Sequence, residues 1–348
     1  MLKKLLVSLL STLLCISVVA ETESQLNGNQ NETDVKIDEK GDVFVAPLKY
    51  HITSDSTAEV IKDGSYKKLE SVVIPSEIRI GGHVYSVTSI GDYAFGWCDR
   101  LTHIEIPSSV TSIGKESFSF CSGLTSIEIP SSVTSIGNKA FSFCSGLTSI
   151  NVSNDNPYYS SDEGILYDKN KTVLICAPKG KKGEIKIPSG VTRIEGSAFR
   201  YCRYVKNIMI SSNVTSIGEW AFSGCFSLTS VNIPSSLTSI GKCAFMWCTS
   251  LTSVEISFGL TSIRESVFNG CSSLTSISIP SSVISIGDGA FSDCKALTSI
   301  NIPSSVTSIG KKAFYGCENL EIVIDNSKEN VIVEENTFED CKSVKFLK

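Results

Sequence analysis

The chain has 348 residues, of which 41% are hydrophobic, and a net charge of −5 from 31 basic and 36 acidic residues. This acidic balance lacks the clustered lysines and arginines that bind phosphates, so we expect no nucleic-acid partner. The hydrophobic fraction is ordinary for a packed protein, whereas the charged fraction of 19% is low, so hydroxyl groups supply much of the polar surface.

The first twenty residues have the pattern of a secretory signal peptide. Lys3 and Lys4 precede an apolar run, and small residues end at Ala20, after which we expect cleavage. No later stretch approaches the roughly 20 apolar residues that a membrane span needs. The sequence therefore predicts a secreted or cell-surface protein without a membrane span, whose mature form has 29 basic and 36 acidic residues and a net charge of −7.

Residues 21–45 are polar and are expected to form a flexible leader. Two alternating segments follow, 50–53 and 58–61, which are joined by a Ser-Asp-Ser-Thr turn and are typical of a β-hairpin. We expect residues 46–100 to contain this hairpin and an elongated first repeat. A repeat array needs a cover over the open end of its core, and the hairpin is suitably located to cap it.

Residues 101–348 repeat one unit of twenty-three residues. The unit reads Leu-Thr-Ser-Ile-x-Ile-Pro-Ser-Ser-Val-Thr-Ser-Ile-Gly-x-x-Ala-Phe-x-x-Cys-x-x, and Phe-x-x-Cys occurs ten times in the chain. A fixed period of this length indicates a solenoid, in which each unit buries its apolar face against its neighbours. Intact copies begin at Leu101, Leu124, Val205, Leu228, Leu251, Leu274 and Leu297.

Within one unit, alternation from Leu124 to Ile129 predicts a short strand that Pro130 ends. Gly137 supplies a turn, and residues 140–144 fit one or two helical turns with Phe141 and Cys144 facing inward. The expected fold is an α/β solenoid. It is a right-handed superhelix with a parallel β-sheet on one face, short helices on the other and a β-hairpin cap at the N-terminal end.

This unit closely resembles the BspA-type, or LRR_5, class of leucine-rich repeats, whose signature is Leu-x-x-Ile-x-Ile-Pro-x-x-Val-x-x-Ile-Gly-x-x-Ala-Phe-x-x-Cys. The resemblance covers residues 50–343 and implies a leucine-rich-repeat solenoid. It also implies a secreted or surface protein of a host-associated bacterium or protist, in a family that includes adhesins for host matrix proteins. Departures from the signature are Ser211 and Ser257 at the proline, and Glu195 and Arg264 at the glycine.

The array is interrupted once, by a hairpin insertion at about 153–182. A turn at Tyr158 and Tyr159 precedes a second hairpin, formed by 165–167 and 172–176. Such insertions often bind partners, but this hairpin resembles a recurrent element of the family, and we favour a structural role for it. Four acidic residues could hold calcium, yet they lack EF-hand spacing, so we expect no metal. They are Asp155, Asp162, Glu163 and Asp168. The lysines of the same loop, Lys179, Lys181 and Lys182, are expected to form a solvated face.

Twelve cysteines follow the signal peptide, and ten of them belong to Phe-x-x-Cys. Export permits disulfides, but side chains on equivalent rungs point in parallel, which disfavours the disulfide torsion. We therefore expect a ladder of buried thiols. Cys176 and Cys243 stand outside the ladder and are the candidate reactive thiols.

No catalytic motif is present. The chain has three histidines, no Gly-x-Ser-x-Gly elbow, no His-Glu-x-x-His and no phosphate-binding glycine loop. The repeated hydroxyl groups do not provide the unlike, convergent groups that catalysis requires. We expect neither an enzyme nor a cofactor.

Two surfaces are candidates for partner binding. The outward strand positions carry Glu105, Glu128, Met209 and Glu255 among others, on a threonine-rich face that also suits a merely exposed strand. The residue before the ladder cysteine is aromatic in the first four copies, as Trp97, Phe120, Phe143 and Tyr201, which would form a hydrophobic stripe. These aromatic residues are expected either to contact a partner or to pack under the hairpin.

The sequence thus favours a monomeric, non-catalytic protein-interaction module that binds host extracellular matrix or serum proteins in the manner of an adhesin. The main alternative is a carbohydrate-binding protein or a cell-envelope spacer. A redox-active thiol protein is a third hypothesis.

Overall fold

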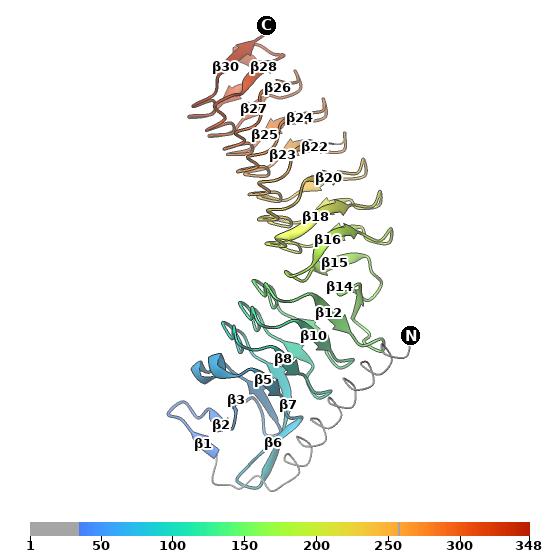
Figure 1. Ribbon diagram of the computed structural model, residues 1–348, viewed down its shortest axis with the longest axis vertical. Coiled ribbons are helices and arrows are strands. Elements are labelled where there is room, and N and C mark those ends of the chain that lie inside the picture. Colours follow the sequence, from blue (N-terminus) through green and yellow to red (C-terminus); the bar gives the residue numbers. More distant parts are fainter. Residues whose placement is uncertain (1–34, 257) are drawn as a thin grey trace, which may run out of the picture.

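A computed structural model of the chain describes residues 35–256 and 258–348. The expected signal peptide, 1–20, and the leader up to residue 34 lie outside these residues. Figure 1 shows an elongated stack of coils, with a sheet of N-terminal strands at one end and the C-terminal residues at the other. The predicted solenoid is confirmed, and its sheets are parallel along the stack.

Each coil contributes one strand from its Leu-x-x-Ile-x-Ile segment. Strands of successive coils pair in parallel, so that Ile127 lies opposite Ile150 and Val231 opposite Val254. In β10 (Ser126–Ile129) and β22 (Ser253–Glu255), for example, the inward residues are buried and the outward ones are exposed, which is the alternation that the sequence predicts. These strands are β5 (Ser71–Val73), β8 (His103–Glu105), β10 (Ser126–Ile129), β12 (Ser149–Val152), β16 (Lys182–Lys186), β18 (Tyr204–Met209), β20 (Ser230–Asn232), β22 (Ser253–Glu255), β24 (Ser276–Ser278), β26 (Ser299–Ile302), β28 (Glu321–Ile324) and β30 (Ser343–Phe346).

A second, shorter strand follows the proline turn in each coil. It is a Ser-Ile pair in all but β17 (Arg193–Ile194) and β29 (Ile332–Val333), and it also pairs in parallel, as Ile217 does with Ile240. The two strands give each coil two rows of hydrogen bonds to its neighbours. The second row is β9 (Ser112–Ile113), β11 (Ser135–Ile136), β17 (Arg193–Ile194), β19 (Ser216–Ile217), β21 (Ser239–Ile240), β23 (Ser262–Ile263), β25 (Ser285–Ile286), β27 (Ser308–Ile309) and β29 (Ile332–Val333).

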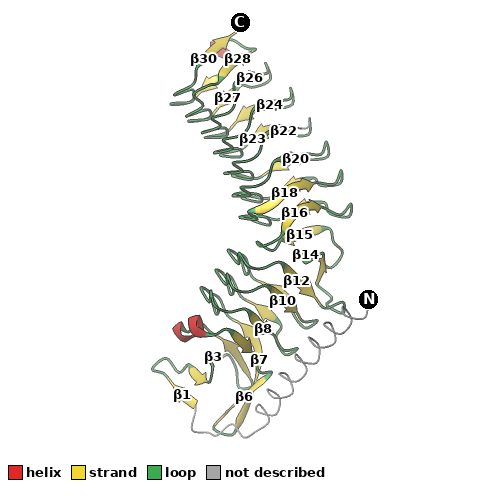
Figure 2. Cartoon of the chain, in the orientation of Figure 1, coloured by secondary structure: helices red, strands yellow, loops and turns green. Residues whose placement is uncertain are grey.

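The prediction of short helices at Ala-Phe-x-x-Cys is wrong. Figure 2 shows the coils as strands and loops, and within the described residues the only helices are the 3-10 helices η2 (Gly64–Lys68) and η3 (Lys328–Asn330). In the first coil Tyr93 and Trp97 adopt positive φ, which a right-handed helix does not contain, and successive N–H groups alternate between the next coil and their own turn. The N–H of Phe95 therefore bonds Ser117 in the next coil at 2.8 Å, while that of Gly96 bonds Tyr93 in its own turn at 2.9 Å.

The core is a stack of phenylalanines beside a ladder of thiols. Phe222 and Phe245 have ring centroids 5.0 Å apart, and both are fully buried. The predicted ladder of buried thiols is confirmed: all ten ladder cysteines are unpaired, and all but the half-buried Cys341 are buried. The buried thiols are also hydrogen-bonded. Cys248 donates its S–H to the carbonyl of Phe222 at 3.2 Å, and other cysteines of the ladder form the equivalent bond.

The insertion divides the core into two clusters rather than one continuous core. It forms the antiparallel strands β13 (Tyr159–Asp162), β14 (Ile165–Asp168) and β15 (Val173–Cys176), which include the predicted hairpin. Adjacent residues of β14 face opposite ways, so Leu166 joins the N-terminal cluster and Ile165 the C-terminal cluster. Because β15 then pairs in parallel with β17, the stack continues after the insertion.

The N-terminal sheet is built from β1 (Val35–Ile37), β2 (Val43–Val45), β3 (Leu48–Ile52), β4 (Thr57–Val60), β6 (Glu77–Ile80) and β7 (His83–Ile90). β3 and β4 form the expected antiparallel hairpin, and β4 joins β7 in parallel. β1 and β2 fall inside the expected flexible leader, so the ordered strands begin before residue 46. The two strands pair antiparallel, with Val35 opposite Val45 and Ile37 opposite Val43.

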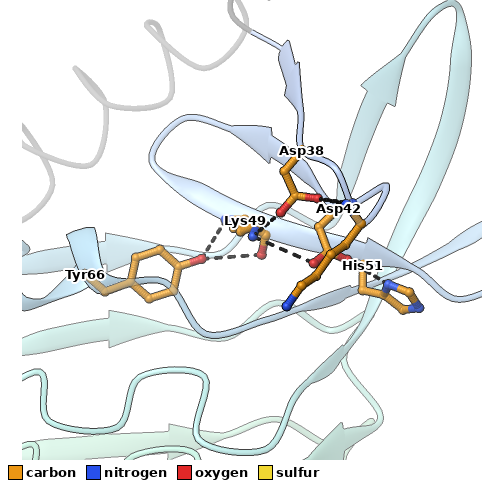
Figure 3. Close-up of polar contacts among 6 residues, drawn as sticks. Asp38, Asp42, Lys49, His51 and Tyr66 are labelled. Carbon is orange, nitrogen blue, oxygen red and sulfur yellow. Dashed lines mark hydrogen bonds and ion pairs between the residues drawn. The ribbon is translucent and has the colours of Figure 1, made fainter.

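Figure 3 shows polar contacts that connect the strands of the N-terminal sheet to one another and to Tyr66. Lys49 forms an ion pair with Asp38 at 2.6 Å, and His51 Nδ1 lies 2.9 Å from Asp42. The hydroxyl of the buried Tyr66 accepts a hydrogen bond from the Lys49 N–H at 2.6 Å. The ring of Tyr66 stacks on Phe95 at 5.2 Å and so extends the phenylalanine stack toward the N-terminal sheet.

Candidate binding site

The residue before each ladder cysteine has a left-handed backbone in every described coil. This conformation suits glycine, which occupies the position at Gly224, Gly270 and Gly316. In the first four coils it is occupied by aromatic residues with φ of 59–66°. A bulky residue in this region costs about 1–3 kcal/mol and persists where the surrounding structure compensates. We call the four residues the aromatic stripe: Trp97, Phe120, Phe143 and Tyr201.

The structure brings the aromatic stripe together as one stack. Ring centroids are 5.4 Å apart for Trp97 and Phe120, 4.4 Å for Phe120 and Phe143, and 5.0 Å for Phe143 and Tyr201. The last pair is contiguous although the insertion separates its members in the sequence. Trp97 is 42% exposed and Phe120 37% exposed, while the other two rings are half-buried. The aromatic stripe is therefore partly exposed.

The aromatic stripe lines a groove of about 490 Å³. Its remaining lining is polar and includes the hydroxyls of Ser122 and Ser145 and the carboxylate of Asp99. The rings in the stripe are nearly parallel, with interplanar angles of 7° and 6° for the first two pairs. The ring faces therefore cover one another, and the groove is lined mainly by ring edges.

Three cations line the same groove: Lys67, Lys179 and Arg203. Within residues 35–256 and 258–348 none of them forms an ion pair with a carboxylate. The guanidinium of Arg203 lies 5.8 Å from the ring centroid of Tyr201, and Arg203 and Lys67 are exposed. The groove is thus locally positive, with Asp99 as its one acidic residue, on a chain whose net charge is negative.

Lys179 lies where the insertion shortens a coil, and it is only 4% exposed. The segment after β15 lacks Phe-x-x-Cys, and the Ala177 N–H donates to the carbonyl of Ala198 in the next coil at 2.9 Å. The Lys179 ammonium donates to the same carbonyl at 3.1 Å and lies 4.0 Å from the sulfur of Cys176. The expectation that Lys179 belongs to a solvated face is wrong, although Lys182 of the same loop is exposed.

Two of the thiols near Lys179 do not neutralise it at neutral pH. Burial lowers the pKa of Lys179 and the surrounding thiolates raise it, with a net increase. That increase requires thiolates, yet burial raises the pKa of Cys202 to about 11 and that of Cys144 to about 12. These two thiols are protonated at neutral pH, and within the described residues no carboxylate forms an ion pair with the buried ammonium.

A second cavity, of about 440 Å³, lies beside the insertion and is also lined by Lys179. Cys176 lines it and is half-buried. Cys243 is buried in the coil that begins at Leu228, and burial raises the pKa of its thiol. Of the two candidate reactive thiols, the structure leaves Cys176 more accessible.

The other candidate residues lie away from the groove. Glu105, Glu128, Met209 and Glu255 are exposed on β8, β10, β18 and β22, and Glu128 accepts a hydrogen bond from Asn151 at 2.6 Å. In the insertion Tyr158 is exposed, whereas the Tyr159 hydroxyl accepts a hydrogen bond from the Ile136 N–H at 3.1 Å. None of these residues lines the groove.

Over 35–256 and 258–348, no group of three or more His, Cys, Asp or Glu side chains could hold a metal ion. In that same part of the chain, no helix has the length and apolar character needed to cross a membrane.

Sequence reasoning identified the aromatic stripe but missed the cations beside it. Lys67 comes from η2, Arg203 follows a ladder cysteine and Lys179 belongs to the insertion, so they share no sequence pattern. The one signal was at Lys179, which sits between apolar Ala177-Pro178 and Gly180 at the point where Phe-x-x-Cys is missing.

Comparison with known proteins identifies the repeat. The family model "BspA type Leucine rich repeat region (6 copies)" matches residues 65–163, 179–284 and 261–348. A crystal structure of a leucine-rich repeat protein from Eubacterium ventriosum is 26% identical with a TM-score of 0.63, over 85% of this chain and 93% of that one. The pneumococcal vaccine antigen PcpA has the same fold, at 18% identity and a TM-score of 0.54, over 88% of this chain and 92% of that one. No curated protein matches the chain.

Proposed function

This chain belongs to the BspA-type leucine-rich repeat family, and from that premise we propose that it is a non-catalytic protein-interaction module that binds host extracellular proteins in the manner of an adhesin. Leucine-rich repeat proteins generally bind proteins, and members of this family are typically secreted or displayed at the surface. The partner contacts the aromatic stripe.

The observation that carries this proposal is the exposure of large aromatic side chains at strained backbone positions. Trp97 and Phe120 are more than a third exposed, and each holds a left-handed conformation that glycine would adopt without strain. Exposed tryptophan and phenylalanine beside arginine are typical of the residues that dominate protein interfaces. A stripe kept for stability alone would be expected inside the core.

The test is binding of the mature chain from residue 21 to immobilised matrix glycoproteins and serum proteins, measured by biolayer interferometry. We expect saturable binding to one of them, and a loss of at least about tenfold in the Trp97→Ser/Phe120→Ser double variant, as for interface hot spots. Trp247→Ser is the matched control, because Trp247 is 40% exposed at the same coil position with φ of 61° and lies outside the groove.

Three results contradict the proposal. Equal losses in the double variant and in Trp247→Ser would indicate a nonspecific hydrophobic effect. Loss of binding together with a much lower melting temperature would indicate a structural role for the stripe. Binding to a glycan array without binding to any protein would favour the carbohydrate-binding alternative.

Further features are part of the same proposal. We propose that residues 1–20 are removed as a signal peptide, that 21–34 are a leader, that the N-terminal sheet caps the repeat array and that the chain is a monomer. Sequencing the N-terminus of the exported protein checks the first point, with cleavage after Ala20 expected. Light scattering on a sizing column checks the last, with the mass of one chain expected.

A further inference from the structure

Within residues 35–256 and 258–348, Lys179 is a buried cation that forms no ion pair with a carboxylate. The residue is 4% exposed, and its ammonium has backbone carbonyls, at 3.1 Å for Ala198 and 3.5 Å for Ser197, as its oxygen acceptors. Carbonyls orient an ammonium but do not neutralise it, and buried charges in proteins are normally paired. The charge of Lys179 is therefore incompletely compensated in the unliganded chain.

The position of Lys179 makes this charge available to a ligand. The residue lines the groove of the aromatic stripe on one side and the cavity beside the insertion on the other. Lys67 and Arg203 add two exposed cations to the groove, against the single carboxylate of Asp99. A ligand that brings negative charge gains from all three cations in a site where water is partly excluded.

The aromatic stripe selects for the same kind of ligand. Because its rings stack on one another, the groove is lined mainly by ring edges. Ring edges carry the positive part of the aromatic quadrupole and attract anionic groups, whereas cationic ligands require open ring faces. A sugar that stacks on an aromatic ring also requires an open face. The groove therefore combines apolar surface with a preference for anions.

We propose that the groove binds an acidic peptide segment of the partner protein, with apolar side chains along the aromatic stripe and one carboxylate paired with Lys179. This inference rests on the proposed function and names the chemistry of its ligand. It also gives the shortened coil a function, because a regular coil would place a phenylalanine and a cysteine where Lys179 now lies.

The probe is a blocked synthetic pentapeptide that alternates glutamate with phenylalanine or leucine, titrated into the mature chain by isothermal calorimetry. The matched probe replaces each glutamate by glutamine. We expect saturable binding of the acidic peptide, at least tenfold weaker binding of the glutamine peptide, and weaker binding of the acidic peptide as salt is raised.

The decisive variant is Lys179→Met, which keeps an unbranched side chain only one heavy atom shorter and removes its charge. We expect a loss of at least tenfold in affinity for the acidic peptide, with a melting temperature that is unchanged or higher because an uncompensated buried charge is gone. Lys182→Met is the matched control, since this lysine is exposed in the same loop, and should change affinity less than twofold. Arg203→Gln, at an exposed position, should give an intermediate loss without unfolding.

Several outcomes overturn the inference. They are equal affinity for the two peptides, unchanged affinity in Lys179→Met, or binding of a sulfated polysaccharide without binding of the acidic peptide. The failure of this inference can be told apart from failure of the proposed function. Protein capture that depends on Trp97 and Phe120 but not on Lys179 would support the proposed function and contradict the acidic-peptide site. Peptide binding without protein capture would support the acidic-peptide site and contradict the proposed function.

Discussion

The coils before and after the insertion share one interior and differ in one surface position. Phe118 and Phe141 stack at 5.8 Å before it and Phe245 and Phe268 at 5.6 Å after it, and ladder thiols on both sides bond the phenylalanine carbonyl. The left-handed residue before the cysteine is aromatic in the N-terminal coils but mostly glycine or aspartate in the C-terminal ones. The repeated core thus stabilises all the coils alike. The strained aromatic position distinguishes the N-terminal surface, which we propose binds the partner protein.

The largest expected effect tests whether the two cores are equivalent. Phe118→Ala in the N-terminal cluster and Phe268→Ala in the C-terminal cluster each remove a fully buried ring between two stacked neighbours. Each should lower the free energy of unfolding by about 3–5 kcal/mol. Urea denaturation of both variants checks this expectation. A loss below about 1 kcal/mol in either one would mean that its cluster does not need the ring.

A glycine substitution tests the cost of the left-handed position in the C-terminal coils. Gly224 has φ of 71°, and an added Cβ would lie 2.6 Å from the Tyr201 ring, so Gly224→Ala combines strain with a clash. Gly183→Ala is the control, with φ of 81° and no atom within 4 Å of the new Cβ. We expect about 1–2 kcal/mol from strain alone in the control and a larger loss at Gly224. Equal melting temperatures for the two variants would contradict a destabilising clash between the new Cβ and the Tyr201 ring.

The converse substitution tests the aromatic stripe. Phe120→Gly removes the left-handed strain, worth about 1–2 kcal/mol, but also two ring stacks of about 0.5–1.5 kcal/mol each. Because these effects oppose each other, the melting temperature should change little while partner binding falls. Thermal unfolding and interferometry on one preparation separate the two effects. A large drop in melting temperature would show that the stripe belongs to the structural core.

Thiol chemistry distinguishes the insertion from both sets of coils. The thiolate is the reactive form of cysteine. Burial raises the pKa of the ladder thiols, to about 12 for Cys271 and Cys317. These thiols should therefore react slowly at neutral pH and faster only as the pH rises toward their pKa values. Cys176 is half-buried beside a cavity and should react first with a disulfide reagent in the native chain. Stopped-flow labelling should give one fast thiol at pH 7.5. A fast phase that persists in Cys176→Ser would contradict this assignment.

The smallest effect concerns exposed ion pairs at the two ends of the stack. The Lys49 ammonium lowers the pKa of the Asp38 carboxyl, and Lys342 lowers that of Glu321. A lowered carboxyl pKa adds stability above the ordinary pKa of the group, and this stability is lost as pH falls through the lowered value. Asp38→Asn and Glu321→Gln should therefore lower the melting temperature slightly at pH 7 and not at pH 2. A difference that persists at pH 2 would point to packing rather than charge.

Local pattern predicted the repeated parts of the fold well and the irregular parts less well. The parallel strands, the hairpins and the buried thiols follow from alternation and spacing that every coil repeats. The short helices did not form, because Tyr93 and Trp97 have a left-handed backbone and hydrogen bonds to the next coil replace those of a helix. Propensity within one coil cannot reveal this outcome, since the compensating bonds come from the next coil.

The sequence by itself determined the period, the identity of the core residues and the aromatic residues of the stripe, because a repeated apolar pattern can bury itself in only one stacked arrangement. Only the tertiary structure decided that Tyr201 follows Phe143 in the stack and that Lys67, Lys179 and Arg203 share one groove. Those residues come from η2, the insertion and a coil beyond it. Their proximity depends on how the shortened coil resumes the stack, and this depends on long-range strand pairing between β15 and β17.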